Sequence, residues 1–176
     1  QGKVSMENLA ITKALRGYYK NPHQIGHRVL ADRIGARDPG NKPKPGDRMK
    51  FVFVVNDKPK ALMGDKIETP EFITQNQLKI DYNHYITNQL MKPLQQLFGL
   101  SLEQIWELQN KKSAIKTYIK EMEKLEKDYI DMEEFMKKKE KYCAAKIKVL
   151  LFDKTLTKIY NEKHGIQQIT NFFVKK

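Results

Sequence analysis

Residues 37–47 constrain what this chain can fold into more than any other stretch of its sequence. The segment reads RDPGNKPKPGD and holds three Pro and two Gly residues, which interrupt both helices and strands. Residues 49–55, which follow it, are rich in β-branched and aromatic side chains, and this pattern predicts a strand that is buried on both faces. We therefore expect an irregular loop that leads directly into a core strand.

The residues on either side of this loop and strand predict three further elements. Residues 9–15 are expected to form a short strand. Asn21 followed by Pro22 predicts the start of a helix, with the Asn side chain as its cap, and Gly35 predicts the end of that helix. Residues 56–60 are expected to turn the chain, and residues 61–63 to pair back as a β-hairpin.

The rest of the sequence has helical patterns. Thr69, just before Pro70, predicts the start of a short helix, and Asp81 predicts the start of a longer one. Pro93 should kink or divide this longer helix, because proline has no backbone N–H. Ser101, with Gln104 three residues later, predicts a capping box at the start of the next helix.

Apolar residues repeat every seven positions from Ile115 to Met136. The repeat fits either a coiled coil between chains or a helical hairpin within one chain, and about three heptads are few for a coiled coil. We therefore expect the hairpin, with Trp106 as an anchor for the C-terminal helices. The predicted fold class is α+β and predominantly α-helical, with a small β-hairpin in the N-terminal half.

Positive charge is concentrated at the front of the chain. The net charge is +12, and the first 60 residues hold 13 Lys and Arg against 5 Asp and Glu. A focused positive surface most often binds a polyanion, and nucleic acid is the first class to consider.

No catalytic constellation is visible. The sequence has no Asp-x-Asp pair and no Gly-rich phosphate loop. His23 and His27 would share one face of a helix, but no third ligand is evident, so we predict no metal site. The single Cys143 excludes an internal disulfide and a four-cysteine zinc site. It fits a buried small apolar residue better than a reactive thiol.

The chain also lacks targeting and membrane signals. No apolar run approaches the roughly 18 residues that a bilayer requires, and no signal peptide is visible. The first residue is Gln rather than Met. We therefore expect a piece of a longer protein, whose catalytic part lies elsewhere.

Four blocks in sequence resemble the B-family DNA polymerases. They are ITKALRGYYKNP at residues 11–22, LADRIGARDPG at 30–40, PGDRM at 45–49 and DYNHYITNQLMKP at 81–93. Their order and spacing match the thumb region that follows the palm, most closely in polymerases of large eukaryotic DNA viruses. The resemblance implies a thumb-like helical domain with a basic DNA-facing surface at residues 1–100. A helical extension at 101–163 and a tail at 164–176 would follow it.

In this family the thumb contacts phosphates of the primer–template duplex without reading its sequence. Basic residues beside the first strand, on the first helix, in the Pro/Gly loop and after the hairpin fit this role. Each has the alternative of a solvated surface residue or a partner of a nearby Asp. The residues that the resemblance and the charge pattern together nominate as DNA contacts are Lys13, Arg16, Lys20, Arg28, Lys42, Lys44, Arg48 and Lys66.

The resemblance also implies what the rest of the polymerase would supply. The parent enzyme would be a DNA-directed DNA polymerase, a nucleotidyltransferase that uses two divalent metal ions, Mg²⁺, in a palm outside this chain. No cofactor is expected in the fragment itself. It would be a monomer and would act at sites of DNA replication, in the nucleus or in a cytoplasmic viral factory.

The last residues, HGIQQITNFFVKK, resemble a peptide that binds a PCNA-type sliding clamp. Ile169, Phe172 and Phe173 occupy the aliphatic and aromatic positions, and Ile166 stands where Gln is usual. The alternative is that the Phe pair folds back onto the helices. Two other functions also stay open: a stand-alone nucleic-acid-binding module, including one for RNA, and a helical protein-interaction domain.

Overall fold

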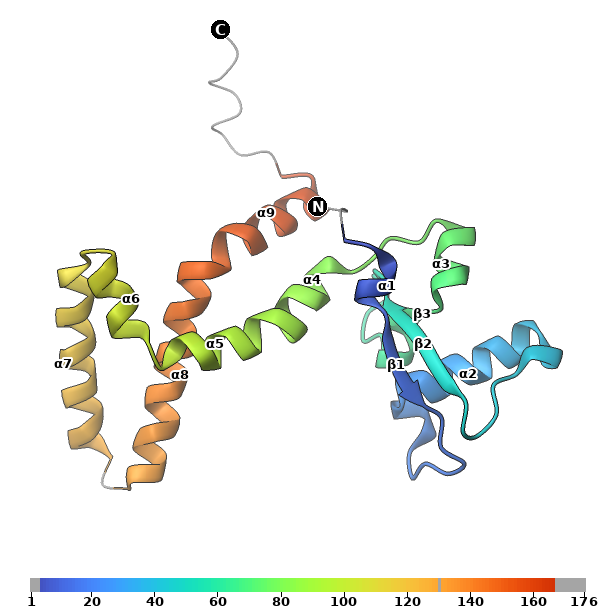
Figure 1. The fold of residues 1–176 in the computed structure, drawn as a ribbon, viewed down its shortest axis with the longest axis horizontal. Helices are drawn as coiled ribbons and strands as arrows, with labels where there is room; N and C mark the ends of the chain where they lie inside the picture. Colours follow the sequence, from blue (N-terminus) through green and yellow to red (C-terminus); the bar gives the residue numbers. More distant parts are fainter. Residues whose placement is uncertain (1–3, 130, 167–176) are drawn as a thin grey trace, which may run out of the picture. The chain divides into compact units, whose positions relative to one another are not determined.

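A three-stranded antiparallel sheet organises the first part of the chain (Figure 1). In the computed structural model, which describes residues 4–129 and 131–166, the strands are β1 (Ile11–Ala14), β2 (Arg48–Phe53) and β3 (Ile67–Glu68). β2 lies between the other two strands and pairs with both of them. The short first strand and the core strand after the Pro/Gly loop are therefore confirmed.

The third strand begins later than the sequence predicts. Residues 61–63 do not pair back, and β3 follows a 3-10 helix, η3 (Met63–Lys66). The Asp65 carboxylate accepts a hydrogen bond from the Leu62 N–H at 3.0 Å, and the Asn56 side-chain amide donates to the Asp65 carbonyl at 2.7 Å. These side chain–backbone bonds close the loop and replace ladder pairing at residues 61–63.

The first long helix, α2 (Gly26–Arg37), differs from its prediction at both ends. Residues Pro22–Gln24 form a 3-10 turn (η1), the Asn21 side chain caps nothing, and the helix continues past Gly35. Both glycines of the helix allow close approach of a neighbour. A Cβ on Gly26 would lie 2.9 Å from Met63 Cγ, and a Cβ on Gly35 would lie 2.6 Å from Lys42 Cγ. Tertiary packing, which local patterns do not reveal, therefore sets where the helix begins and continues.

The first core lies between α2 and the sheet. Its buried residues include Leu30 of α2, Val52 of β2 and Ile73 of α3 (Pro70–Asn76). The Tyr85 hydroxyl joins the N-terminal segment to this core, because it donates to the Leu9 carbonyl at 2.8 Å and accepts from the Phe53 N–H at 2.9 Å. The described elements that complete this region are α1 (Met6–Leu9) and η2 (Pro39–Asn41).

Two predicted helix starts are confirmed. Thr69 Oγ1 accepts from the Phe72 N–H at 3.3 Å at the start of α3, and Asp81 Oδ1 accepts from the His84 N–H at 2.9 Å at the start of α4 (Tyr82–His84). α4 continues as a π-helical segment (η4, Tyr85–Met91) and then as α5 (Lys92–Gly99). The division that Pro93 predicts therefore falls directly before it.

The chain forms two compact units, Gln1–Tyr85 and Ile86–Lys176. This boundary falls within the helical run, whereas the sequence predicts a first domain that extends to residue 100. Helix α5 packs with the second unit, where Gln95 Nε2 donates to the Ala144 carbonyl at 2.9 Å.

The second unit consists of helices. After α5 come α6 (Leu102–Leu108), α7 (Lys112–Asp128), α8 (Met132–Leu151) and α9 (Asp153–His164). Trp106, which the sequence predicts to anchor the C-terminal helices, is buried in the core of this unit, and its ring meets the Tyr118 ring edge-on with centroids 5.8 Å apart. The predicted capping box is wrong, because Ser101 has ψ near 17° and its side chain caps nothing. An extended backbone at this position would be needed for the hydroxyl to reach the third helical N–H.

Helices α7 and α8 form the expected hairpin. The Tyr118 and Tyr142 rings from the two helices have centroids 6.0 Å apart, and Met132 and Met136 of the seven-residue repeat are more than half exposed. The repeat therefore does not continue as one helical seam. Cys143 is buried in this core, and burial raises the pKa of its thiol, which confirms the interpretation as a small apolar residue. The α+β, predominantly α-helical class is also confirmed.

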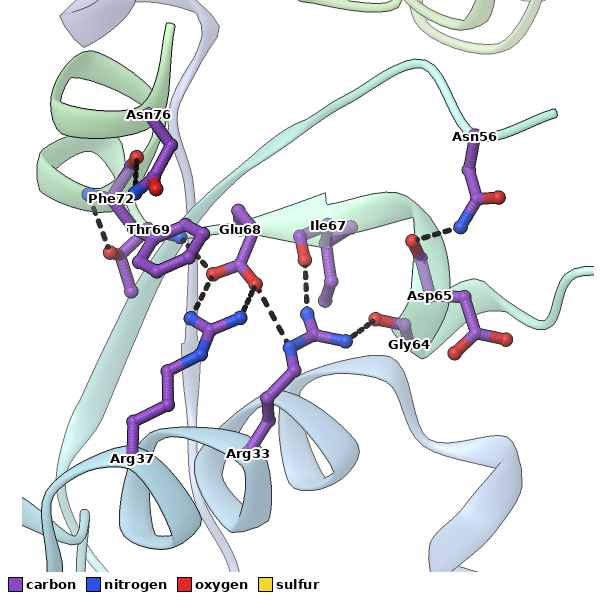
Figure 2. Close-up of polar contacts among 10 residues, drawn as sticks. All are labelled: Arg33, Arg37, Asn56, Gly64, Asp65, Ile67, Glu68, Thr69, Phe72 and Asn76. Atoms are coloured by element: carbon purple, nitrogen blue, oxygen red, sulfur yellow. Dashed lines mark hydrogen bonds and ion pairs between the residues drawn. The ribbon is translucent and has the colours of Figure 1, made fainter. Parts of the chain in front are cut away.

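A buried carboxylate ties α2 to β3 (Figure 2). Glu68 is 5% exposed, and the Arg37 guanidinium donates to both of its oxygens, at 2.8 and 3.3 Å. Arg33 Nε forms a second ion pair with Glu68 at 2.9 Å, while its two terminal nitrogens donate to the carbonyls of Gly64 and Ile67. Arg37 also lies 3.6 Å from the centroid of the Phe72 ring. The cluster fixes the helix against the strand and neutralises part of the positive charge of α2.

Replacement of Glu68 with Gln should destabilise the first unit by about 2–4 kcal/mol, because two partly buried guanidinium groups would lose their counter-charge. Amide hydrogen exchange in β2 measures this loss, and fluorescence of the single Trp106 reports the second unit as an internal reference. Asp32→Asn is the matched control. Asp32 is 48% exposed in its ion pair with Arg28, so its loss should cost at most about 1 kcal/mol. Equal effects of the two substitutions would contradict this account of the cluster.

Candidate nucleic-acid interface

The paired strands β1 and β2 present an exposed face that carries positive charge. Directly paired residues share one face of a sheet, and the register pairs Thr12 with Lys50 and Ala14 with Arg48. All four of these residues are exposed, whereas Met49 and Phe51, which alternate with them, are buried. We call these four positions the ladder face: two cations beside two small side chains.

A tight turn extends the ladder beyond the last strand pair. The Leu15 N–H donates to the Asp47 carbonyl and the Gly46 N–H to the Leu15 carbonyl, both at 2.8 Å. Asp47 also accepts from the Lys44 N–H at 2.7 Å, and Gly46 has φ +97°, which favours glycine. After the exposed residues Thr12 to Ala14, Leu15 is buried and Arg16 is exposed. Arg16 and Lys44 are thereby held at the same end of the ladder as Arg48.

Hydrogen bonds of the Tyr19 hydroxyl hold residues 16–19, which follow the first strand. The Tyr19 hydroxyl accepts from the Arg16 N–H at 2.7 Å and lies 2.9 Å from His27 Nε2. Burial lowers the pKa of His27, and the positive charges of Lys13 and Arg16 lower it further. These two cations therefore lie close enough to His27 to act on its charge. Lys20 follows Tyr19 and is exposed.

The basic side chains of the first unit divide into paired and unpaired groups. Arg28 and Lys42 flank one carboxylate, with nitrogen–oxygen distances to Asp32 of 2.9 and 3.7 Å, and Arg33 and Arg37 share Glu68. Within the described residues, the following basic side chains of this unit have no carboxylate at ion-pair distance: Lys13, Arg16, Lys20, Lys44, Arg48, Lys50, Lys58, Lys60, Lys66 and Lys79.

Not every nominated residue lies at this end of the ladder. The Lys66 carbonyl accepts from the Val54 N–H at 2.8 Å, which places Lys66 at the opposite end of β2, about 20 Å along the strand from Arg48. Lys13 pairs with Met49, so its side chain leaves the ladder on the other face from Arg48.

Lys50 is a basic residue of the ladder face that the sequence interpretation missed. The prediction of a strand buried on both faces hid it. The alternation of Arg48, Met49, Lys50 and Phe51 between charged and apolar side chains was the signal for one exposed face.

The nominated clamp-binding residues lie at or beyond the limit of the described chain. Ile166 follows α9 and is 50% exposed, while Ile169, Phe172 and Phe173 lie outside the described residues. In the part of the chain that the structure describes, no three His, Cys, Asp or Glu side chains converge to hold a metal ion. Neither does any helix there combine the length and the apolar character needed to cross a bilayer.

Comparison with known proteins identifies the family to which the sequence is similar. The sequence model of DNA polymerase family B matches residues 1–101. A DNA polymerase of Pyramimonas orientalis virus is 44% identical over 181 aligned residues, which cover 98% of this chain and 14% of that protein. A DNA polymerase of Acanthamoeba polyphaga mimivirus is 44% identical over 107 residues, 58% of this chain and 6% of that protein.

Other relatives match a little over half of the chain with lower identity. The DNA polymerase delta catalytic subunit of Candida albicans is 36% identical over 98 residues, 56% of this chain and 9% of that protein. The chain therefore spans only a small part of the length of these relatives. The resemblance to B-family polymerases that the four sequence blocks predict is confirmed.

The lowered pKa of His27 predicts a pH effect on the first unit. Below the ordinary value of 6.5, the unfolded chain binds a proton at this position more readily than the folded chain does. Stability should therefore fall as the pH decreases through the window between 6.5 and the lower folded pKa. Titration of the His27 ring by NMR checks the shift directly. Lys13→Gln should raise the pKa, whereas Lys58→Gln should leave it unchanged. Titration at or above 6.5 would contradict the assigned environment.

Proposed function

Because the chain belongs to DNA polymerase family B, we propose that it is the thumb region of such a polymerase and grips the primer–template duplex through its phosphates. The whole enzyme would be a DNA-directed DNA polymerase, and its palm, outside this chain, would hold two Mg²⁺ ions for nucleotidyl transfer. It would act as a monomer at sites of DNA replication, in the nucleus or in a cytoplasmic viral factory.

The observation that supports the grip is the uncompensated charge of the ladder face. Phosphate contacts supply most of the affinity of proteins for DNA and carry no sequence information. Arg48 and Lys50 lie two residues apart on one strand, roughly 6.7 Å, and Thr12 and Ala14 beside them are too small to hold a duplex away. A polymerase must bind every sequence, so such contacts suit its task.

The other basic residues that the sequence nominates differ in how near they lie to the ladder face. Arg16 and Lys44 lie beside the ladder face and extend it, and the exposed Lys20 follows Tyr19, whose hydroxyl accepts from the Arg16 N–H. Lys13 leaves the ladder on its other face. The remaining three, Arg28, Lys42 and Lys66, would make secondary contacts, because they are already paired with Asp32 or lie at the far end of β2.

A triple substitution tests the grip. Arg16→Gln with Arg48→Gln and Lys50→Gln should weaken duplex binding by roughly tenfold or more at low salt. It should also make the slope of log affinity against log salt shallower by about 0.9 for each phosphate that the variant no longer neutralises. Fluorescence anisotropy with a labelled primer–template, over a series of salt concentrations, measures both quantities.

The control removes the same charge from the other end of β2. Lys58, Lys60 and Lys79 are exposed there, and their replacement with Gln should leave both quantities close to those of the parent chain. Equal losses in the two triple variants would show a general charge effect and would count against the ladder face. Preference for single strands or RNA over duplex would favour a stand-alone nucleic-acid module. Oligomers without DNA affinity would favour a protein-interaction domain.

We further propose that the C-terminal tail tethers the polymerase to a PCNA-type sliding clamp and so increases processivity. The sequence supports this, because Ile169 and the Phe pair have the spacing of a hydrophobic plug. An exposed apolar plug in a polar terminus would otherwise be a liability.

Phe172→Ala with Phe173→Ala should abolish binding to such a clamp without lowering the melting temperature. In this proposal the two Phe side chains fill a pocket of the clamp and do not pack in the core of this chain. Surface plasmon resonance on immobilised clamp and a thermal melt give the two readouts. A large loss of thermal stability would favour packing of the Phe pair onto the helices instead.

A further inference from the structure

All the lysines of helix α7 lie on one face. They are Lys112, Lys116, Lys120, Lys124 and Lys127, and all are exposed. At about 100° per residue, positions four apart advance by only about 40°, so the set spans an arc of about 120°. On the opposite arc Tyr118 is buried and Met122 packs against the second core. The lysine face is therefore turned away from the helical bundle.

These lysines lack the kinds of partner that four of the six lysines of the neighbouring helix have. On α8, Lys137 pairs with Glu133 at 2.6 Å and Lys148 pairs with Asp153 at 3.5 Å. Lys138 lies 5.3 Å from the centroid of the Tyr129 ring.

No lysine of α7 has a carboxylate at ion-pair distance among residues 4–129 and 131–166. This includes Lys127, although Glu123 stands four residues before it, at the spacing of a helical ion pair. Glu123 itself lies within the arc and is exposed, so this face carries five positive charges and one negative charge, and none of the lysines is held by a carboxylate.

We propose that the lysine face of α7 is a second phosphate-binding surface, which contacts the backbone of double-stranded DNA. The inference rests on the proposed function, since it concerns the same duplex, but it lies on a different unit of the chain. Four residues of helix rise about 6 Å, so Lys112 to Lys124 span about 18 Å. This length corresponds to about five base-pair steps of 3.4 Å.

The residue types of this face favour duplex phosphates over other anionic partners. Lysine is a point charge on a flexible stem, which adapts to phosphates in many positions. No aromatic side chain lies within the arc to stack on the bases of a single strand. The apolar side of α7 is occupied by the core, so the helix has no free face to insert into a membrane.

Two triple variants with the same loss of charge test the proposal. Lys116→Gln, Lys120→Gln and Lys124→Gln should lower the affinity of the full chain for a long primer–template duplex by roughly tenfold at low salt. The salt slope should become shallower by about 0.9 for each phosphate that these lysines neutralise in the parent chain. In the control, Lys137→Gln, Lys138→Gln and Lys141→Gln on α8 should change the affinity less than about twofold. Circular dichroism and Trp106 fluorescence verify the fold of both variants.

The outcomes separate this inference from the proposed function. If the ladder-face variant loses duplex affinity and the α7 variant does not, the inference is overturned and the proposed function stands. If the α7 variant alone loses affinity, the lysine face is supported and the ladder face is not. Equal losses in the α7 and α8 variants would overturn the inference. So would a loss of binding to phosphatidylserine vesicles in the α7 variant with unchanged duplex affinity.

Discussion

The ion cluster around Glu68 is the contact on which the first unit depends. One carboxylate, 5% exposed, joins α2 to β3 through two arginines. A buried ion pair adds little net stability by itself, because both groups lose hydration, but removal of one partner is costly. The cluster therefore acts as a constraint on geometry: α2 must run as far as Arg37 to reach the carboxylate, and η3 must present the Gly64 carbonyl to Arg33. Once the helix and β3 are fixed in this way, β2 is held between β1 and β3.

Ion pairs with Glu68 and Asp32 occupy some of the basic side chains of the first unit and leave others without a carboxylate partner. Arg33 and Arg37 are committed to Glu68, and Arg28 is committed to Asp32. Of the cations left without a counter-charge in the described residues of this unit, Arg16, Lys44, Arg48 and Lys50 lie on or beside the ladder face. Lys58, Lys60, Lys66 and Lys79 lie toward the other end of β2. A net charge alone would not distinguish these groups, since paired and unpaired cations contribute equally to it. The pattern of pairing and the register of β1 and β2 together suggest the position of the proposed duplex-binding surface. In the described part of the second unit, ion pairs hold two lysines of α8 and none of α7.

Much of the fold follows from local sequence, and the failures have physical causes. The cap of Asp81 and the strand after the Pro/Gly loop have signals in neighbouring residues, and both are where the sequence predicts them. The end of α2 depends on a partner far along the chain, so Gly35 misleads: it makes room for a lysine side chain and the helix continues to its ion pair. The exposed cations of the proposed site follow from the sequence only in part. Arg48 follows from the loop before the strand, whereas Lys50 required the exposed face of that strand to be recognised, and pairing of Arg28 was visible only in three dimensions.

The most direct test of this account is a lysine footprint of the chain bound to a primer–template duplex. Acetylation under mild conditions, followed by mass spectrometry, compares the reactivity of each lysine with and without DNA. We predict that Lys44 and Lys50, beside and on the ladder face, become protected, while Lys58 and Lys60 at the other end of β2 keep their reactivity. Uniform protection of all four, or no protection of Lys50 under conditions in which the duplex is bound, would contradict the claim that the unpaired cations of the ladder form the binding surface.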